Sequence, residues 1–218
     1  MAYVLGFIAA DGSLEDATYL RGKYLRVCSN DLEIIDKIRS VMCSEHRVQK
    51  IKPKEFTFNN KIYVSKEKYL LRIGSHEIYD DLVRLGITPH KSKTIKFPSV
   101  PGSFISSFIR GYFDGDGCVS IYYKNKRLSA TFTSGSKSFL EQLSDVISKA
   151  LRKKRHEVFI NNRAFQLKYS TKEAVLLLRK IYSAASEKLY LERKYNKFLE
   201  FLRLYPKWNY LFATYPSG

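Results

Sequence analysis

Apolar and polar positions of this 218-residue chain follow two periodicities, and both occur in each half of the sequence. Apolar residues spaced three to four apart predict amphipathic helices. These helices cover residues 31–42, 75–85, 136–151, 171–185 and, near the C-terminus, 187–204. Asn30 or Asp31 and Ser136 can cap the helices that follow them, because their side-chain oxygens accept hydrogen bonds from free N–H groups.

Alternation of apolar and polar residues predicts half-buried strands. In RLSATFTS, for example, Leu128, Ala130 and Phe132 alternate with serine and threonine. The predicted strand regions are 19–29, 47–51, 69–73, 119–124, 128–134, 157–160 and 165–169. Each antiparallel sheet should therefore have one apolar face and one face with basic and hydrogen-bonding groups.

The two halves open on related apolar segments that end in acids and glycines. YVLGFIAADGS aligns with FIRGYFDGDGC at an offset of 105 residues, which places Gly6 over Gly111 and Asp11 over Asp116. Farther along, the offset falls to 96, because residues 52–66 add a longer polar hairpin to the first half. We interpret the chain as two copies of one unit.

The segment KFPSVPGS joins the copies, since its prolines and glycine are typical of a linker. We expect a first repeat at residues 1–97, a linker at 98–103, and a second repeat with a C-terminal helix at 104–218. The predicted fold class is α+β, with two pseudo-symmetric αββαββα repeats and antiparallel sheets.

Small residues recur at four-residue spacing in both opening helices. Gly6 and Ala10 share one helix face, as do Gly111 and Gly115. The two helices can therefore pack closely at the repeat interface, which places the acids at their C-terminal ends side by side. The glycines that follow, Gly12 and Gly117, are suited to a left-handed helix cap.

Positive charge is the main compositional signal. Lys and Arg total 38 against 21 Asp and Glu, for a net charge of +17. A polyanion is the expected partner, and a β-ribbon fits the major groove of double-stranded DNA. The predicted DNA-binding residues are Arg21, Lys23, Arg26, Lys50, Lys52, Arg72, Tyr122, Lys124, Arg127, Thr131, Thr133, Asn161, Arg163, Gln166 and Lys168.

The paired acids raise an electrostatic question. A helix C-terminus is already negative, so aspartate there is unfavourable unless a cation lies beside it. A single DGDG sequence could be an ordinary polar turn, but two symmetric copies favour a shared metal site. Oxygen-only ligation suits Mg²⁺, with Mn²⁺ as a substitute. Next to a DNA-binding sheet, such a site indicates metal-assisted phosphodiester hydrolysis.

VLGFIAADG and IRGYFDGDG resemble the two motifs of the LAGLIDADG homing endonucleases in their monomeric, single-chain form. The resemblance implies a DNA-binding saddle of two sheets and cleavage of each strand of a long target. It also implies that Asp11 and Asp116 are catalytic metal ligands, together with the backbone carbonyls of Ala10 and Gly115.

The family further places a lysine near the end of each copy, which here offers Lys91 or Lys93 and Lys194. We retain Lys91 and Lys194 as catalytic candidates, although a lysine in so basic a chain is often only a solvated charge. Ala9 replaces the first motif aspartate, whose counterpart is Asp114. This difference makes the halves unequal and predicts a non-palindromic target without loss of activity.

Three other functions remain open: an intron RNA splicing helper, a non-catalytic DNA-binding regulator and an intein-borne nuclease. The sequence lacks the terminal nucleophile and His-Asn pair of splicing chemistry. Three scattered cysteines and four scattered histidines predict neither disulfides nor a zinc site, and Trp208 is interpreted as a packing residue. No signal peptide or membrane-length apolar run is visible, which predicts an intracellular location, in an organelle matrix or prokaryotic cytoplasm.

Overall fold

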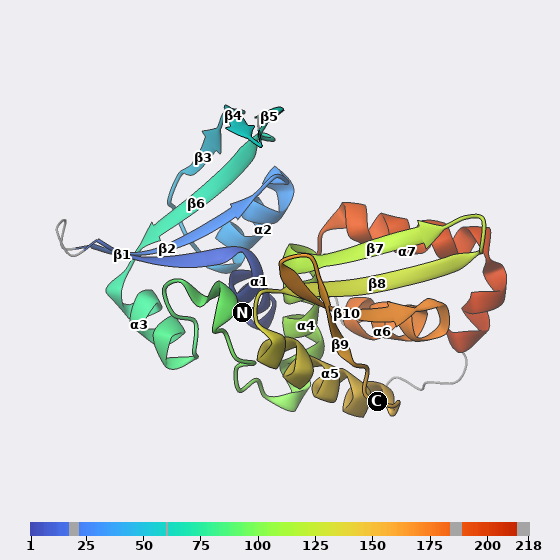
Figure 1. Cartoon of the computed structure of the whole chain (residues 1–218). Coiled ribbons are helices and arrows are strands. Elements are labelled where there is room, and N and C mark those ends of the chain that lie inside the picture. The colour runs from blue at the N-terminus through green and yellow to red at the C-terminus, as the bar shows by residue number, and fades with distance from the viewer. Residues whose placement is uncertain (18–21, 60, 184–188, 213–218) are drawn as a thin grey trace.

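A central helix pair separates two antiparallel sheets in the computed structural model, which describes residues 1–17, 22–59, 61–183 and 189–212 (Figure 1). The pair consists of α1, Ala2–Asp11, and α4, Ile105–Asp116. Helix α1 is apolar nearly all round because it is buried between the two halves of the molecule. This arrangement confirms the predicted α+β class with a repeated helix–strand unit.

The two four-stranded sheets have the same topology. The first has the order β1-β2-β6-β3, with β1 at Gly12–Ala17, β2 at Gly22–Ser29, β6 at Lys68–Gly74 and β3 at Val48–Ile51. The second has the order β7-β8-β10-β9, with β7 at Gly117–Tyr122, β8 at Arg127–Ser134, β10 at Ala164–Ser170 and β9 at Val158–Asn161. The identical order confirms that the two copies have the same fold.

Helices cover one face of each sheet, where apolar residues such as Leu25, Leu71, Phe132 and Leu167 are buried. The covering helices are α2, Leu32–Val41, and α3, His76–Arg84, in the first half, then α5, Lys137–Leu151, α6, Thr171–Ser183, and α7, Glu192–Leu204, in the second. Short 3-10 turns occur at Lys91–Lys93, Gly102–Phe104 and Pro206–Phe212. We use the term outer face for the opposite side of each sheet.

A separate two-stranded ribbon belongs to the first half alone. It consists of β4, Glu55–Phe58, and β5, Lys61–Val64, and it extends away from the sheet at the top of Figure 1. The ribbon lies within residues 52–66, which the change of repeat offset assigned to an extra hairpin. The predicted position of the hairpin is confirmed, but its predicted polar character is wrong, since five of its large apolar side chains are exposed.

Several boundaries differ from the sequence prediction. The first strand starts at Gly12 rather than near residue 19, because the polar sequence of β1 conceals the burial of Leu14 and Ala17. Helix α7 starts at Glu192 rather than at residue 187. Ser136 caps α5 as predicted by accepting a hydrogen bond from the Phe139 amide, whereas Asp31 precedes α2 without such a bond.

Residues 95–101 between the halves have no regular secondary structure. They are packed nonetheless, since the Phe97 ring lies 5.1 Å from Phe108 and 5.7 Å from Phe139. The proposed repeat boundaries and linker limits stay a prediction. Trp208 is half-buried against the core, as expected of a packing residue.

Gly6 and Gly111 allow the central helices to touch through their backbones. A Cβ added at Gly6 would lie 2.1 Å from the Phe108 carbonyl oxygen, and one at Gly111 would lie 1.9 Å from that of Tyr3. Both distances are far inside van der Waals contact. The predicted helix interface at Gly6 and Gly111 therefore requires glycine at both positions.

Candidate active site

The crossing of α1 and α4 brings Asp11 and Asp116 into one site. Each acid is the last residue of its helix, and the next residue starts a strand without an intervening loop. A methyl group at Gly115 would lie 2.4 Å from Ala10 Cβ and 3.3 Å from Asp11 Oδ2, so the two motif ends are in contact. The structure thus confirms the predicted proximity of the acids.

The glycines after the acids serve a different purpose from the one predicted. Gly12 has φ −82° and Gly117 has φ −92°, so both are extended rather than left-handed. A Cβ would meet the Ile8 carbonyl oxygen at 2.6 Å or the Phe113 carbonyl oxygen at 2.3 Å. Glycine is needed because the chain leaves each helix too tightly for a side chain.

Burial makes both carboxylates costly to ionise. Desolvation raises the pKa of Asp116 to about 6, and the nearby Asp11 carboxylate adds to the rise. Desolvation also raises the pKa of Asp11, although Lys194 and Lys91 oppose this effect. Neither acid forms an ion pair with a described residue. The site therefore holds negative charge that its own side chains leave partly uncompensated.

This shift predicts a pH dependence of stability in the absence of divalent ions. An acid with a raised folded-state pKa favours folding while it is protonated, and that advantage is lost as the pH rises through about 6. We expect the free energy of unfolding in EDTA to fall by up to about 3 kcal/mol between pH 4 and pH 7 through Asp116. Urea titrations of the wild-type protein and Asp116→Asn measure this contribution, and equal pH profiles for the two proteins would contradict it.

Two buried lysines occupy equivalent positions beside the acids. Lys91 Nζ donates to the carbonyl oxygens of Gly12 at 2.7 Å and Ala10 at 3.4 Å. Lys194 Nζ donates to those of Phe113 and Asp114 at 2.7 Å and to that of Gly115 at 3.2 Å. Each ammonium thus lies at the negative end of one central helix, where a cation is stabilised.

Burial also lowers the pKa of both lysines. Each retains only 5% of its exposed surface, and desolvation lowers the pKa of Lys91 and brings that of Lys194 to about 8. Lys93, the other residue considered in the first half, is exposed. Lys91 and Lys194 are therefore the lysines that share the site with the acids, while their catalytic role stays a prediction.

Asp114 has a structural environment that the sequence did not reveal. Its carboxylate is buried and accepts hydrogen bonds from Tyr3 Oη at 2.8 Å, Tyr182 Oη at 3.1 Å and the Leu191 amide at 2.9 Å. Leu191 immediately precedes α7, which carries Lys194. Asp114 therefore anchors the segment that brings Lys194 to the site, and Ala9 offers no such anchor in the first half.

The second sheet presents its predicted DNA-binding residues on the outer face. Strand pairing sets Thr131 opposite Lys168 and Thr133 opposite Gln166, while their sequence neighbours Phe132 and Leu167 are buried. The Lys168 ammonium lies 5.6 Å from the Tyr122 ring centroid. The other predicted residues of this half are exposed on strand ends and turns: Lys124, Arg127, Asn161 and Arg163.

On the first sheet, the outer face contains Arg26 and Arg72, which are directly paired. Glu15 accepts hydrogen bonds from Arg72 at 3.2 and 3.3 Å and lies 3.8 Å from Arg26. Arg72 also stacks on Tyr24, with its guanidinium carbon 3.4 Å from the ring centroid. Glu15 and Tyr24 were missed in the sequence, because only the strand register shows that they adjoin the arginines.

Two predicted DNA-binding residues lie on the wrong face. Lys23 lies two residues before buried Leu25 on β2 and therefore on the same face. Its ammonium donates a hydrogen bond to Asp80 of α3 at 2.6 Å. Lys50 lies on the same face of β3 as Val48 and forms an ion pair with Glu67 at 2.9 Å. The alternation of β2 and β3 directs both toward the helix-covered side, which corrects the prediction. Lys52 is exposed beyond β3, and Arg21 lies outside the described residues.

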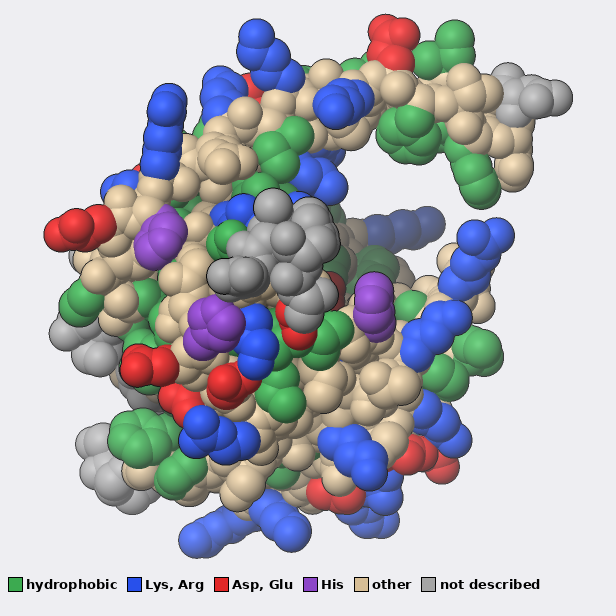
Figure 2. All heavy atoms as spheres, turned by 90° about the vertical axis from the view of Figure 1, so that its left-hand side faces the viewer, with side chains coloured by type: hydrophobic (Ala, Val, Ile, Leu, Met, Phe, Trp, Pro, Cys, Tyr) green, Lys and Arg blue, Asp and Glu red, His purple; other side chains and the backbone are tan. Residues whose placement is uncertain are grey.

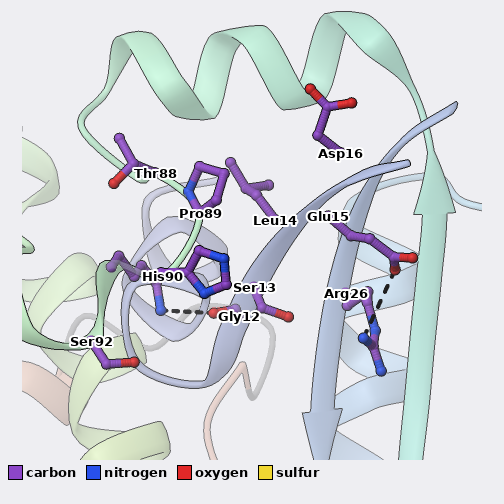
Figure 3. Close-up of a pocket in the computed structure, with 11 residues that line it drawn as sticks. Gly12, Ser13, Leu14, Glu15, Asp16, Arg26, Thr88, Pro89, His90 and Ser92 are labelled. Carbon is purple, nitrogen blue, oxygen red and sulfur yellow. Dashed lines mark hydrogen bonds and ion pairs between the residues drawn. The ribbon is translucent and has the colours of Figure 1, made fainter. Parts of the chain in front are cut away.

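A groove of about 490 Å³ connects Lys91 with the outer face of β1 (Figure 3). Ser13, Glu15 and Arg26 line one side, and residues 88–92 line the other. His90 has a left-handed backbone, with φ 56°, at the start of the turn that carries Lys91. Lys91 itself lines the groove, so the groove reaches the lysine site. Figure 2 shows lysine and arginine side chains on both sides of an open hollow of the molecule.

The residues at the helix ends fit a hard divalent cation. They supply two carboxylates and the backbone carbonyls of Ala10 and Gly115. Each carbonyl accepts the longest of the hydrogen bonds that its lysine donates, at 3.4 Å for Ala10 and 3.2 Å for Gly115, and keeps a second lone pair free. Among the described residues, no three His, Cys, Asp or Glu side chains form a metal-binding group. Further ligands would have to be water or a phosphate oxygen, as Mg²⁺ often uses.

Three comparisons place this architecture among known proteins. Residues 103–182 match the family described as LAGLIDADG-like domain. The chain also matches proteins described as "Probable translation initiation factor IF-2", at 28% identity over 146 residues in Thermococcus kodakarensis and over 177 residues in Methanocaldococcus jannaschii. These matches cover 65% and 78% of this chain but only 11% and 13% of those proteins.

A third relative is the "Reverse gyrase" of Methanocaldococcus jannaschii, at 29% identity over 145 residues, or 8% of its length. The chain thus corresponds to about a tenth of the length of these relatives. Because the chain matches only a small part of proteins with two different names, the similarity does not identify it as an initiation factor or a gyrase.

Solved structures extend the likeness to both halves. The homing endonuclease I-WcaI bound to its DNA recognition sequence has a TM-score of 0.61 and 13% identity, covering 90% of this chain and 84% of its own. I-DmoI in complex with DNA and Ca has a TM-score of 0.56 and 17% identity, covering 84% and 88%. Other I-DmoI complexes were solved with Mn or Mg. Residues 103–182 thus match a LAGLIDADG-like domain, and the whole chain has a two-unit fold similar to that of the LAGLIDADG homing endonucleases.

Proposed function

We propose that the chain is a monomeric, site-specific endonuclease of double-stranded DNA that uses Mg²⁺, or Mn²⁺ in its place, to hydrolyse one phosphodiester in each strand. The observation that carries this proposal is the meeting of Asp11 and Asp116 between two sheets with basic outer faces. The DNA complexes of structurally similar homing endonucleases support it.

The acids and the carbonyls of Ala10 and Gly115 would hold the divalent ions. Bound there, the ions supply Lewis-acid stabilisation of the charge that develops on phosphate. Lys91 and Lys194 place cationic groups beside the same position, where they would bind the scissile phosphates. Since the pKa of Lys194 is about 8, its Nζ can also exchange a proton near neutral pH.

The outer faces would bind the target on both sides of this centre. Lys and Arg provide phosphate contacts, while Arg26, Arg72, Gln166 and Lys168 are suited to base edges in the major groove. Glu15 holds both arginines of the first sheet and would fix their orientation. Because the two faces carry different residues, we expect a long target without palindromic symmetry.

Cleavage of a randomised duplex library tests the function directly. With Mg²⁺ present, we expect the sequenced ends to fall repeatedly within one long asymmetric sequence, with one cut in each strand. EDTA should abolish these ends, because the carboxylate pair would lose its ions. Tight DNA binding without cleavage would favour a regulator, and preference for folded RNA would favour a splicing helper.

A further inference from the structure

The ribbon formed by β4 and β5 carries exposed apolar side chains that have no role in the proposed endonuclease function. Phe56, Phe58, Ile62, Tyr63 and Val64 are all between 43% and 74% exposed. A two-stranded ribbon has little stability of its own in water, so large exposed apolar side chains on it are unfavourable without a partner. The second half has only a short turn between β9 and β10 at this position.

Strand register sorts these side chains into two different faces. Phe56 pairs with Tyr63 and Phe58 with Lys61, and the Ser65 amide donates a hydrogen bond to the Lys54 carbonyl oxygen, which extends the ladder in the same register. Side chains alternate along a strand, so the aromatic residues and both lysines share one face. The opposite face carries Glu55, Thr57, Ile62 and Val64. We call the first the aromatic-basic face: Lys54, Phe56, Phe58, Lys61 and Tyr63.

The side chains of the aromatic-basic face are exposed to solvent, and two of them stack against each other. The rings of Phe56 and Tyr63 stack with centroids 5.7 Å apart and an interplanar angle of 21°. Within the described part of the chain, neither Lys54 nor Lys61 forms an ion pair. Residues 52–68 contain five lysines and two glutamates, for a net charge of +3. The face therefore suits a ligand that is both anionic and able to stack.

We propose that the aromatic-basic face binds unpaired nucleotides of a single-stranded nucleic acid. Aromatic side chains stack on exposed bases, and neighbouring lysines bind the phosphates between them. Duplex DNA fits less well, because its bases are already stacked and inaccessible to the rings. A protein partner would need an acidic apolar surface to match the same lysines. The proposal goes beyond DNA cleavage and does not depend on it.

The test measures fluorescence anisotropy of labelled dT12 and U12 oligonucleotides in EDTA at moderate salt. We expect the double variant Phe56→Ala/Tyr63→Ala to bind both at least about tenfold more weakly than the wild type. Ile62→Ala is the control on the opposite face of the ribbon. Phe104→Ala removes a similarly exposed phenylalanine at the start of α4, the end remote from Asp116. Both controls should bind within about twofold of the wild type.

Comparison of the two oligonucleotides identifies the source of the ligand. Equal losses would assign the face to bases of either nucleic acid, and a larger loss for U12 would assign it to RNA. Unchanged binding in the double variant would overturn the proposal, and so would equal losses in the controls. An equal loss for a 12-base-pair duplex would also overturn it. Photo-crosslinking of 5-iodouracil oligonucleotides should label the segment 55–64.

Discussion

Replacing Asp116 by asparagine is expected to reduce double-strand cleavage at least about 100-fold while target binding stays intact. The amide keeps the shape of the side chain but removes half of the carboxylate pair that would hold the divalent ions. Lewis-acid stabilisation of phosphate is worth several kcal/mol, and each 1.4 kcal/mol corresponds to tenfold in rate. Asp11→Asn should have a comparable effect, because both acids share one site.

Cleavage of a plasmid that carries the selected target measures this effect, and gel-shift titration measures binding. Asp145→Asn is the matched control: it makes the same chemical change on α5, where Asp145 pairs with Arg155 near the surface. We expect this control to cleave at the wild-type rate. Undiminished cleavage by Asp116→Asn would exclude the proposed metal site, whatever the fold.

Gly111→Ala is expected to produce the largest loss of stability of any single methyl addition to this chain. Its new Cβ would lie 1.9 Å from the Tyr3 carbonyl oxygen, which is the backbone of the opposing helix and cannot rotate away. The two central helices would have to separate, although they lie within the hydrophobic core that spans both halves. Overpacking of a rigid core commonly costs 1–3 kcal/mol, and we expect about 3 kcal/mol or more here.

Urea denaturation monitored by circular dichroism measures the loss. Gly6→Ala should resemble it, since its Cβ would meet the Phe108 carbonyl oxygen at 2.1 Å. Gly102→Ala is the matched control, because no atom lies within 4 Å of the added methyl group. Equal stability of Gly111→Ala and Gly102→Ala would show that the helices do not cross as described.

These two effects are linked through the same helix crossing. The acids occupy the last positions of α1 and α4, so any separation of the helices also separates Asp11 from Asp116. A substitution at Gly6 or Gly111 that still allows folding should therefore reduce the cleavage rate by more than the fraction of unfolded protein explains. The candidate active site therefore depends on the interface between the two halves.

The sequence alone determined the features that arise from local periodicity and repetition. The repeated motif predicted the helix pair, the close approach at Gly6 and Gly111, and the proximity of Asp11 and Asp116. Helical periodicity placed most of the helices within a few residues, and the change of repeat offset located the extra hairpin. These predictions succeeded because an internal repeat supplies two independent observations of each element.

Only the tertiary structure decided which polar side chains meet. Lys23 and Lys50 looked like Arg26 in the sequence, but register turned them to the helix-covered face, because a strand reverses its side-chain direction at every residue. Glu15 lies beside both Arg26 and Arg72. The buried carboxylate of Asp114 accepts hydrogen bonds from Tyr3, Tyr182 and the Leu191 amide. These contacts join residues as many as 111 positions apart, and hydrophobic periodicity carries no information about them.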